Sequence, residues 1–334
     1  MGAVGIIGTG AYLPEKVLTN ADLEKMVDTS DEWIVTRTGI RERRMVGENE
    51  ASSDLAVKAA HQALQSAGIT ADQLDLIIVA TVTPDMSFPA TACLVQDRLG
   101  AGKAATFDLS AACTGFIYGI ATASQFIQNG VYRHALVVGV DCLSKITDFT
   151  DRNTCVLFGD GAGAAVLGPV EEGSGFYSFD LGGDGSGGHL LKQSAGGSRM
   201  PATQETVKNR LHSISMNGRE VFKFAVRVLG ASAEETLKKA GLQKEDVDYL
   251  VPHQANIRII ETAVKRLGLS QEKVIVNLDR YGNMSSASIP VALDEAVRTG
   301  KIRKGDNIVL VGFGGGMTWG STVLKWTMET QGEV

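Results

Sequence analysis

The chain has 334 residues, of which 44% are apolar and 21% charged, a composition typical of a folded protein with a large core. Its formal net charge of −6 argues against a general nucleic-acid-binding protein. No apolar run reaches the roughly 18 residues of a membrane span, and residues 1–16 lack the basic and apolar regions of a signal peptide. The four cysteines form no C-x-x-C pair, so we expect reduced thiols and a cytoplasmic protein.

Strand-like and helix-like segments alternate along the chain. Residues 52–67 carry apolar side chains at helical spacing, with Ser52 or Ser53 as the expected cap and Gly68 as the expected end. Residues 22–38 form a polar stretch that we also expect to be helical. Buried strands are predicted over residues 4–13, 74–82, 135–141 and 164–167. This alternation predicts an α/β protein with buried sheets.

The sequence contains an internal repeat. Shifting it by 173 positions aligns residues 63–81 with 236–254, matches the apolar positions and keeps an alanine, a glycine and an aspartate. The same shift places the helix predicted after Cys113 on the one predicted after Ser286. We infer two similar halves, residues 1–172 and 173–334, each an α/β layer and related by a pseudo-twofold axis. The alternative is the general regularity of βα units.

Cys113 follows the strand-like run 104–109 and begins a largely apolar helix. The unpaired N–H groups and the positive dipole end of a helix favour a thiolate, so such a site can lower the pKa of a cysteine. Cys113 is therefore a candidate nucleophile. The alternative is a cysteine that merely fills space in a buried helix.

Two other segments can meet Cys113 at a central cleft if the halves pack about a twofold axis. His253 follows the strand-like run 247–251, and Asn283 precedes the helix equivalent to the one at Cys113. Taken singly, the histidine could be structural and the asparagine could cap a helix. The glycine-rich segment 312–316 could be a tight turn, or a loop whose backbone N–H groups face a ligand oxygen.

Several short motifs occur together along essentially the whole chain. They are Gly8-Thr9-Gly10, Thr29-Ser30-Asp31-Glu32-Trp33-Ile34, Arg37-Thr38-Gly39-Ile40, Ala112-Cys113, Phe158-Gly159-Asp160-Gly161-Ala162-Gly163, Pro252-His253-Gln254-Ala255-Asn256, Gly282-Asn283 and Gly314-Gly315-Gly316-Met317-Thr318-Trp319-Gly320. Together they resemble the thiolase-like condensing enzymes, and most closely the β-ketoacyl-acyl-carrier-protein synthase III family. A Cys-His-Asn set distinguishes this group from relatives with Cys-His-His or Cys-His-Cys. The resemblance implies a thiolase-like α/β fold with αβαβα layers.

The resemblance also implies a reaction, the initiating condensation of bacterial type II fatty acid synthesis. Cys113 would be acylated by an acyl-coenzyme A primer, and malonyl-acyl carrier protein would then lose carbon dioxide and attack the acyl group. The backbone N–H groups of Cys113 and Gly315 would form the oxyanion hole, and His253 and Asn283 would stabilise the enolate. No metal and no organic cofactor is implied.

Further residue roles follow only from this resemblance. For coenzyme A, it implies stacking on Trp33, with Arg37, Arg152 and Asn256 nearby. Position 219 is Arg where some members have a pantetheine-contacting Asn, so that contact is not expected.

The resemblance further implies a homodimer in which Phe88 bounds the partner's acyl pocket, which Phe313 would also line. An acidic carrier protein would dock on basic residues, for which the candidates are Lys223, Arg258, Lys265 and Arg266. Neither nucleic acid nor a membrane is expected as a partner.

Alternatives remain open at this level. A condensing or acyl-transfer enzyme of secondary metabolism would keep the same three catalytic residues, and a cysteine hydrolase would need a base to activate water. A non-condensing acyl-binding or regulatory subunit would be expected to lack Cys113 or an oxyanion-hole glycine, and this chain has both. Gly159 and Gly161 fit a dinucleotide fingerprint, but a strand-like run follows where that motif needs a helix. The primer and the role of the glycine-rich insert 183–201 are not determined by these patterns.

Overall fold

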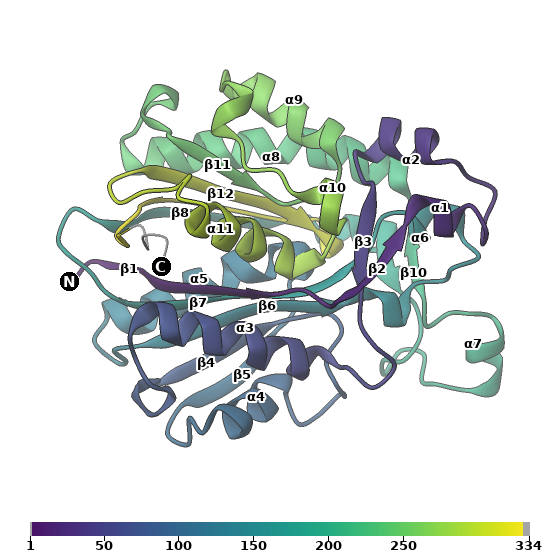
Figure 1. Cartoon of the computed structure of the whole chain (residues 1–334), viewed down its shortest axis with the longest axis horizontal. Coiled ribbons are helices and arrows are strands. Elements are labelled where there is room, and N and C mark those ends of the chain that lie inside the picture. Colours follow the sequence, from purple (N-terminus) through teal and green to yellow (C-terminus); the bar gives the residue numbers. More distant parts are fainter. Residues whose placement is uncertain (1, 330–334) are drawn as a thin grey trace.

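The structure is a computed structural model that describes residues 2–329, and it stacks helices and sheets in five layers (Figure 1). Each of the three helix layers contains two long helices, and the two sheets lie between them. In order, the helix layers are α3 (Ser52–Ala67) with α4 (Thr91–Leu99), α5 (Gly115–Gln128) with α11 (Ser288–Arg298), and α8 (Gly218–Ala240) with α9 (Ile257–Leu267).

The two sheets have the same strand order. The first contains β1 (Val4–Tyr12), β7 (Asp160–Pro169), β6 (Ala135–Cys142), β4 (Leu76–Ala80) and β5 (Ala105–Leu109). The second contains β8 (Gly175–Gly183), β13 (Thr318–Lys325), β12 (Asn307–Gly314) and β11 (Tyr249–Pro252). A single parallel bridge from Leu250 to Val274 takes the place of a fifth strand there. The predicted boundary after residue 172 falls in the connection between β7 and β8, and the division into two domains stays a prediction.

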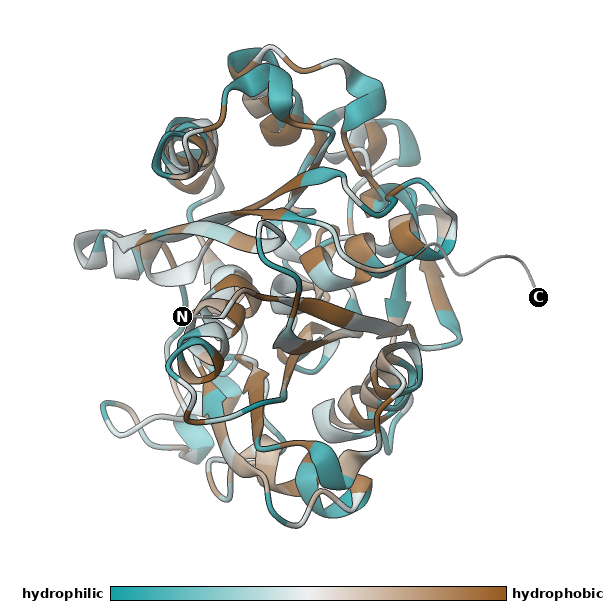
Figure 2. Cartoon of the chain, turned by 90° about the vertical axis from the view of Figure 1, so that its left-hand side faces the viewer, coloured by the Kyte–Doolittle hydropathy of each residue, from teal (hydrophilic) through white to brown (hydrophobic). Residues whose placement is uncertain are grey.

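Alternating side chains explain why helices cover both faces of each sheet. In β4, Leu76 and Ile78 pack toward the middle helices, whereas Ile77 and Val79 pack toward α3 and α4. Figure 2 shows apolar residues along the strands and along the helix faces turned toward them. Strands buried on both faces need such continuous apolar runs, which the sequence shows.

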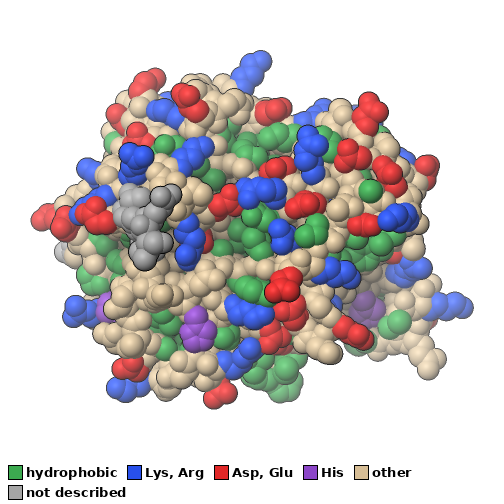
Figure 3. All heavy atoms as spheres, in the orientation of Figure 1, with side chains coloured by type: hydrophobic (Ala, Val, Ile, Leu, Met, Phe, Trp, Pro, Cys, Tyr) green, Lys and Arg blue, Asp and Glu red, His purple; other side chains and the backbone are tan. Residues whose placement is uncertain are grey.

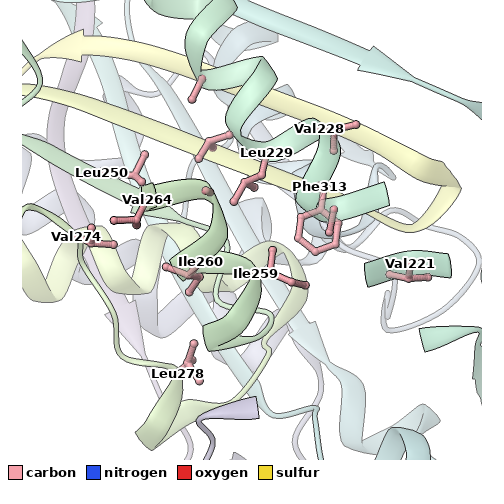
Figure 4. Packing of buried hydrophobic residues seen from close by; sticks show 14 of the residues in the cluster. Val221, Val228, Leu229, Leu250, Ile259, Ile260, Val264, Val274, Leu278 and Phe313 are labelled. Carbon is pink, nitrogen blue, oxygen red and sulfur yellow. The ribbon is translucent and has the colours of Figure 1, made fainter. Parts of the chain in front are cut away.

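The outer layer on the second sheet is positioned by the same rule. Phe313 of β12 points away from the middle helices and packs with residues of α8 and α9 (Figure 4). Among them are Val228 and Leu229 of α8 and Ile259 and Ile260 of α9. This packing sets α8 and α9 beside the end of β12, where the glycine-rich segment begins.

Most of the predicted elements are confirmed. α3 occupies residues 52–67 and ends at Gly68 in a left-handed conformation, but its N-cap is Ala51, so the predicted serine cap is wrong. Both serines lie inside the helix, where Ser53 bonds Asp85 instead. The strand β7 after Gly159 is confirmed, which excludes the dinucleotide fingerprint. Within residues 2–329, no helix has the length and apolarity needed to cross a bilayer.

The remaining elements are short and connect the layers. The polar stretch 22–38 is only partly helical, because α1 (Asn20–Leu23) and α2 (Asp31–Thr38) are separate helices. The insert 183–201 contains a 3-10 segment and the strand β9 (Leu191–Gln193), which pairs with β10 (Ile214–Met216). These elements are β2 (Lys16–Thr19), α1 (Asn20–Leu23), α2 (Asp31–Thr38), β3 (Glu42–Met45), α6 (Arg152–Cys155), β9 (Leu191–Gln193), α7 (Gln204–Lys208), β10 (Ile214–Met216) and α10 (Leu278–Tyr281).

Candidate active site

Two adjoining cavities meet at Cys113. The larger has a volume of about 630 Å³ and is lined by Cys113, His253 and Asn283 at its inner end. The smaller has a volume of about 120 Å³ and lies on the other side of Cys113, with Gly315 in its wall. The three predicted catalytic residues therefore lie in one cleft, although they come from segments far apart in the chain.

Cys113 lies in a 3-10 turn, Ala112–Thr114, which leads directly into α5. Ala112 has a φ of 48°, a left-handed conformation that is uncommon for a residue with a side chain. Opposite this turn, a Cβ on Gly314 would lie only 2.7 Å from the Cys113 backbone nitrogen. The close approach of β12 to the turn therefore requires glycine at position 314.

The thiol of Cys113 is almost completely shielded from solvent, with 8% of the residue exposed. Burial raises the pKa of Cys113 to about 12, and the charge of Asp141 acts in the same direction. The Ser285 hydroxyl and the N–H groups of Cys113 and Gly315 oppose this rise, since they face the sulfur. The expected lowering of the pKa is therefore wrong for this structure, because desolvation outweighs the donors.

His253 follows β11 and is 1% exposed. Its backbone N–H donates to the Val311 carbonyl at 2.8 Å, and its ring meets Phe313 edge-on with 5.6 Å between centroids. Neither ring nitrogen has a hydrogen-bond partner among residues 2–329. Burial lowers the pKa of His253 to about 3, so the imidazole is neutral at pH 7 and carries one donor and one acceptor nitrogen.

Asn283 is held through its backbone on both sides. Its N–H donates to the Leu157 carbonyl at 2.9 Å, and its carbonyl accepts from the Gly159 N–H at 3.0 Å. Its side-chain Oδ1 accepts from the Ser285 N–H at 2.9 Å, and therefore the NH₂ end of the amide remains as a donor for the cavity. Asn283 is the N-cap neither of α11 nor of the 3-10 turn before it, but its side chain does accept from the first N–H of that turn.

Trp33 lines the larger cavity and lies close to two arginines. The guanidinium carbons of Arg37 and Arg152 lie 4.9 and 4.8 Å from the centroid of its ring. Arg37 and Asn256 also line this cavity, whereas Arg152 does not and instead donates to the Asp28 carbonyl. The Asn256 amide is already used, since it donates to the Arg37 carbonyl and its oxygen caps α9.

The two predicted acyl-pocket residues lie in different places. Phe313 is buried and lines the larger cavity beside His253, not the smaller one. Phe88 is 85% exposed in the single chain and lines neither of these two cavities. Their role in an acyl pocket stays a prediction.

The predicted basic residues divide into two groups. Lys223 and Arg258 line the mouth of the larger cavity, together with Arg219. Lys265 and Arg266 lie further along α9, and Arg266 pairs with Glu234 at 2.7 Å. Over the face seen in Figure 3, acidic and basic side chains are interspersed.

Several residues of the site were missed by the sequence reasoning. Phe158 and Leu191 contribute to both cavities, and Ser285 lines the smaller one. The internal repeat contained a signal for this region, since Ser286 is the residue that corresponds to Cys113. Its neighbour Ser285 could have been examined on that ground.

Solved structures with this arrangement define the class of the protein. A β-ketoacyl-acyl-carrier-protein synthase III from Thermus thermophilus superposes with a TM-score of 0.91 at 52% identity, covering 97% of this chain and 99% of that one. A priming β-ketosynthase of the R1128 polyketide pathway superposes with a TM-score of 0.91 at 36% identity, covering 98% and 97%. The chain has the thiolase-like fold and is an acyl-transferring condensing enzyme.

Sequence comparison identifies the family within this class. Residues 107–200 match the family model of 3-oxoacyl-acyl-carrier-protein synthase III, and residues 237–326 match the model of its C-terminal part. A β-ketoacyl-acyl-carrier-protein synthase III from Desulfitobacterium hafniense is 62% identical over 327 residues, or 98% of this chain and 99% of that protein. The chain belongs to the β-ketoacyl-acyl-carrier-protein synthase III family, the initiating condensing enzymes of fatty acid synthesis.

Proposed function

We propose that this enzyme condenses an acyl-coenzyme A primer with malonyl-acyl carrier protein, giving a β-ketoacyl-carrier product, carbon dioxide and free coenzyme A. The observation that carries the proposal is the single cleft lined by Cys113, His253 and Asn283. A relative at 62% identity over 98% of this chain favours this role over secondary metabolism, where the polyketide relative is 36% identical.

In the first step, the sulfur of Cys113 attacks the thioester carbonyl of the primer. A carbon–sulfur bond to Cys113 forms, the bond to coenzyme A breaks, and the thiol proton leaves with the coenzyme A sulfur. The N–H groups of Cys113 and Gly315 face the reacting sulfur and would donate to the oxygen that becomes negative. Because the buried thiol is protonated at rest, its deprotonation has to accompany the attack.

In the second step, malonyl thioester enters through the larger cavity and loses carbon dioxide. The electron pair left behind forms an enolate, whose oxygen needs hydrogen-bond donors. The neutral imidazole of His253 and the NH₂ of Asn283 would supply them. The carbanion then forms a carbon–carbon bond to the acyl carbon on Cys113, and the carbon–sulfur bond breaks. The sulfur leaves as a thiolate and takes up one proton from solvent, which restores the resting thiol. Both steps use the side chains and backbone of the site, without a metal or an organic cofactor.

The outer part of the larger cavity suits the nucleotide end of coenzyme A. Trp33 offers an aromatic ring for adenine, and the neighbouring Arg37 and Arg152 would meet the phosphates. Asn256 would reach the pantetheine arm only by giving up its bond to the Arg37 carbonyl.

The smaller cavity is proposed as the place of the primer's acyl chain. It lies directly behind Cys113, and its apolar wall and about 120 Å³ of volume suit a short acyl group. In a proposed homodimer, the exposed Phe88 would close the partner's cavity. The large apolar residues of the wall are Val82, Leu143, Ile146, Phe158, Leu191 and Ile214.

The malonyl group would be delivered by an acidic carrier protein. Lys223 and Arg258 at the mouth of the larger cavity, with Lys265 and Arg266 on α9, would meet its acidic surface. We place the enzyme in the cytoplasm, where the four free cysteines would stay reduced.

The test is intact-mass spectrometry after mixing the enzyme with a panel of short acyl-coenzyme A thioesters, followed by malonyl-carrier protein. An adduct on Cys113 that malonyl-carrier protein discharges as a β-ketoacyl product is the expected result, and the group loaded fastest identifies the primer. An adduct that persists would contradict the proposal.

A further inference from the structure

Asp141 is a fully buried carboxylate next to the active site. It lies near the end of β6 and is 0% exposed, and no lysine or arginine among residues 2–329 forms an ion pair with it. Five groups lie within donor distance of its two oxygens: the Val82 N–H and the Thr81 and Thr83 hydroxyls at Oδ1, and the N–H and hydroxyl of Ser286 at Oδ2. Burial without a cation is costly unless such donors satisfy the oxygens.

The two backbone N–H donors require an acceptor oxygen at both the Oδ1 and the Oδ2 position of residue 141. The Val82 N–H lies 2.8 Å from Oδ1 and the Ser286 N–H lies 3.2 Å from Oδ2, and a backbone N–H cannot turn round to accept. An asparagine would place its NH₂ group against one of these two N–H groups, whichever way the amide is flipped. The ionised carboxylate is the form that accepts from all sides.

The two oxygens hold segments from different halves of the chain. Oδ1 binds the loop after β4, and Oδ2 binds the turn Ser285–Ala287, which is 145 residues further along the chain. The Ser286 hydroxyl also lies 2.8 Å from the Ala80 carbonyl, so its single proton goes to one of two acceptors in the first half. Asp141 thus fastens the turn of the second half to the sheet of the first.

That turn carries two groups that face the reaction. The Ser285 N–H donates to Asn283 Oδ1 and so orients the amide. The Ser285 hydroxyl is buried in the wall of the smaller cavity without a hydrogen-bond partner in the described chain. Burial raises the pKa of both Cys113 and Asp141, and this hydroxyl lies near enough to both groups to oppose the rise. The Ser285 backbone has a φ of 48°, a sparsely populated conformation that persists only because surrounding contacts hold it.

We infer that Asp141 is a positioning residue for the condensation: its ionised carboxylate, through Ser286, sets the Asn283 amide and the Ser285 hydroxyl relative to Cys113. The inference rests on the proposed function for the role of Asn283. It adds a requirement for a negative charge beside the nucleophile. That charge acts on Cys113, while the neutral His253 on the other side does not.

The first variant is Asp141→Asn in the full-length enzyme, checked by its melting temperature. We expect kcat for malonyl decarboxylation to fall about 10- to 100-fold with little change in KM, a size usual for loss of a group that orients a reacting residue. We also expect the pH dependence of Cys113 alkylation by iodoacetamide to move to lower pH, because a like charge has been removed. A merely structural residue would leave malonyl decarboxylation unchanged in a folded enzyme, whereas the alkylation profile reports whether Asp141 carries a negative charge beside Cys113.

If Asp141→Asn does not fold, a matched pair of variants, Ser286→Ala and Thr81→Val, tests the role of Asp141 instead. Ser286→Ala removes a hydroxyl from the Oδ2 side, whereas Thr81→Val removes one from the Oδ1 side and leaves the turn of the second half untouched. We expect a several-fold fall in decarboxylation for Ser286→Ala and a smaller one for Thr81→Val.

Equal effects in the pair, or an unchanged alkylation profile and normal decarboxylation in a folded Asp141→Asn enzyme, would overturn the inference. Asn283→Ala distinguishes this failure from failure of the proposed function. If Asn283→Ala retains decarboxylation, the proposed function itself is wrong. If Asn283→Ala loses it and Asp141→Asn does not, only the role of Asp141 is wrong.

Discussion

Two turns related by the internal repeat share a similar backbone conformation but differ in their side chains, because one carries a free thiol and the other a hydrogen-bonded hydroxyl. Ala112–Thr114 and Ser285–Ala287 are 173 residues apart, both are 3-10 turns, and each leads into a helix of the middle layer. In each turn the first residue has a φ of 48° without being a glycine. The second residue is Cys113 in one turn and Ser286 in the other.

The difference arises from the residue that faces each turn from the other half. Gly314 faces Cys113 and has no side chain, so the thiol stays free between two cavities. Asp141 occupies the position that corresponds to Gly314 in the repeat, and it faces Ser286, whose hydroxyl it binds. The same turn conformation therefore presents a reactive side chain where the residue that faces it is glycine. It presents a hydrogen-bonded side chain where the residue that faces it is aspartate.

The largest expected effect is loss of the reactive side chain itself. Cys113→Ala removes the sulfur that forms the acyl-enzyme, so neither a mass adduct nor a condensation product is expected. Adding Ser286→Cys to this variant should not restore activity, because a thiol there lies among the contacts of Asp141 and Ala80. An adduct at position 286 would contradict the comparison of the turns.

The next effect concerns the donors beside the free turn. Asn283→Ala and His253→Ala should each spare much of the acylation and remove most malonyl decarboxylation, since the enolate oxygen loses a donor worth roughly 3–4 kcal/mol in comparable sites. Separate assays of primer transfer and carbon dioxide release measure this. Loss of acylation with intact decarboxylation would contradict the assigned roles.

Adding a side chain at position 314, opposite Cys113, should have a smaller but clear effect on activity and stability. In Gly314→Ala the new Cβ would meet the Cys113 backbone nitrogen at 2.7 Å, and a backbone atom can move only with its turn. We expect acylation to slow and the free energy of unfolding to fall by about 1–3 kcal/mol, the usual cost of overpacking. Gly102→Ala, where a Cβ meets nothing within 4 Å, is the control.

Replacing Cys113 by serine, the residue type at the corresponding position of the other turn, should change how the stability of the enzyme depends on pH. Burial raises the pKa of Cys113 from 9.0 to about 12, so the folded state holds this proton more tightly than the unfolded state, and stability falls as pH rises from 9 to 12. Cys113→Ser removes this titration and should flatten the slope by up to about 1.4 kcal/mol per pH unit. Denaturant unfolding at several pH values measures it, and an identical slope in both proteins would argue against the buried thiol.

The smallest effect lies at the mouth of the cavity. Arg258→Glu should raise KM for malonyl-carrier protein several-fold at low salt and leave primer loading nearly unchanged, because an acidic partner would meet a like charge. Lys103→Glu, in the turn before β5, is the control for a change of charge alone. Equal KM values for both variants would remove Arg258 from the docking surface.

Much of this fold could be predicted because local patterns carry it. Buried strands such as β4 and β6 appear as unbroken apolar runs, and α3 shows helical spacing up to its terminal glycine. The cap of α3 could not be predicted, since Ser53 bonds Asp85, a residue 32 positions away. Cys113, His253 and Asn283 were found through motifs, whereas Asp141 was hidden, because a buried aspartate at a strand end has no local signature.

The sequence by itself determined the alternation of strands and helices, the repeat and the chemical types of the reacting groups, since these depend on neighbours in the chain. Only the tertiary structure decided how these groups are protonated and whether their side chains are free or hydrogen-bonded. The pKa of Cys113 rises because the fold excludes water from it, and no local pattern measures that exclusion. The contact between Asp141 and Ser286 joins residues 145 positions apart, so whether the side chain at the start of a helix is free or fixed is decided by the half that packs against it.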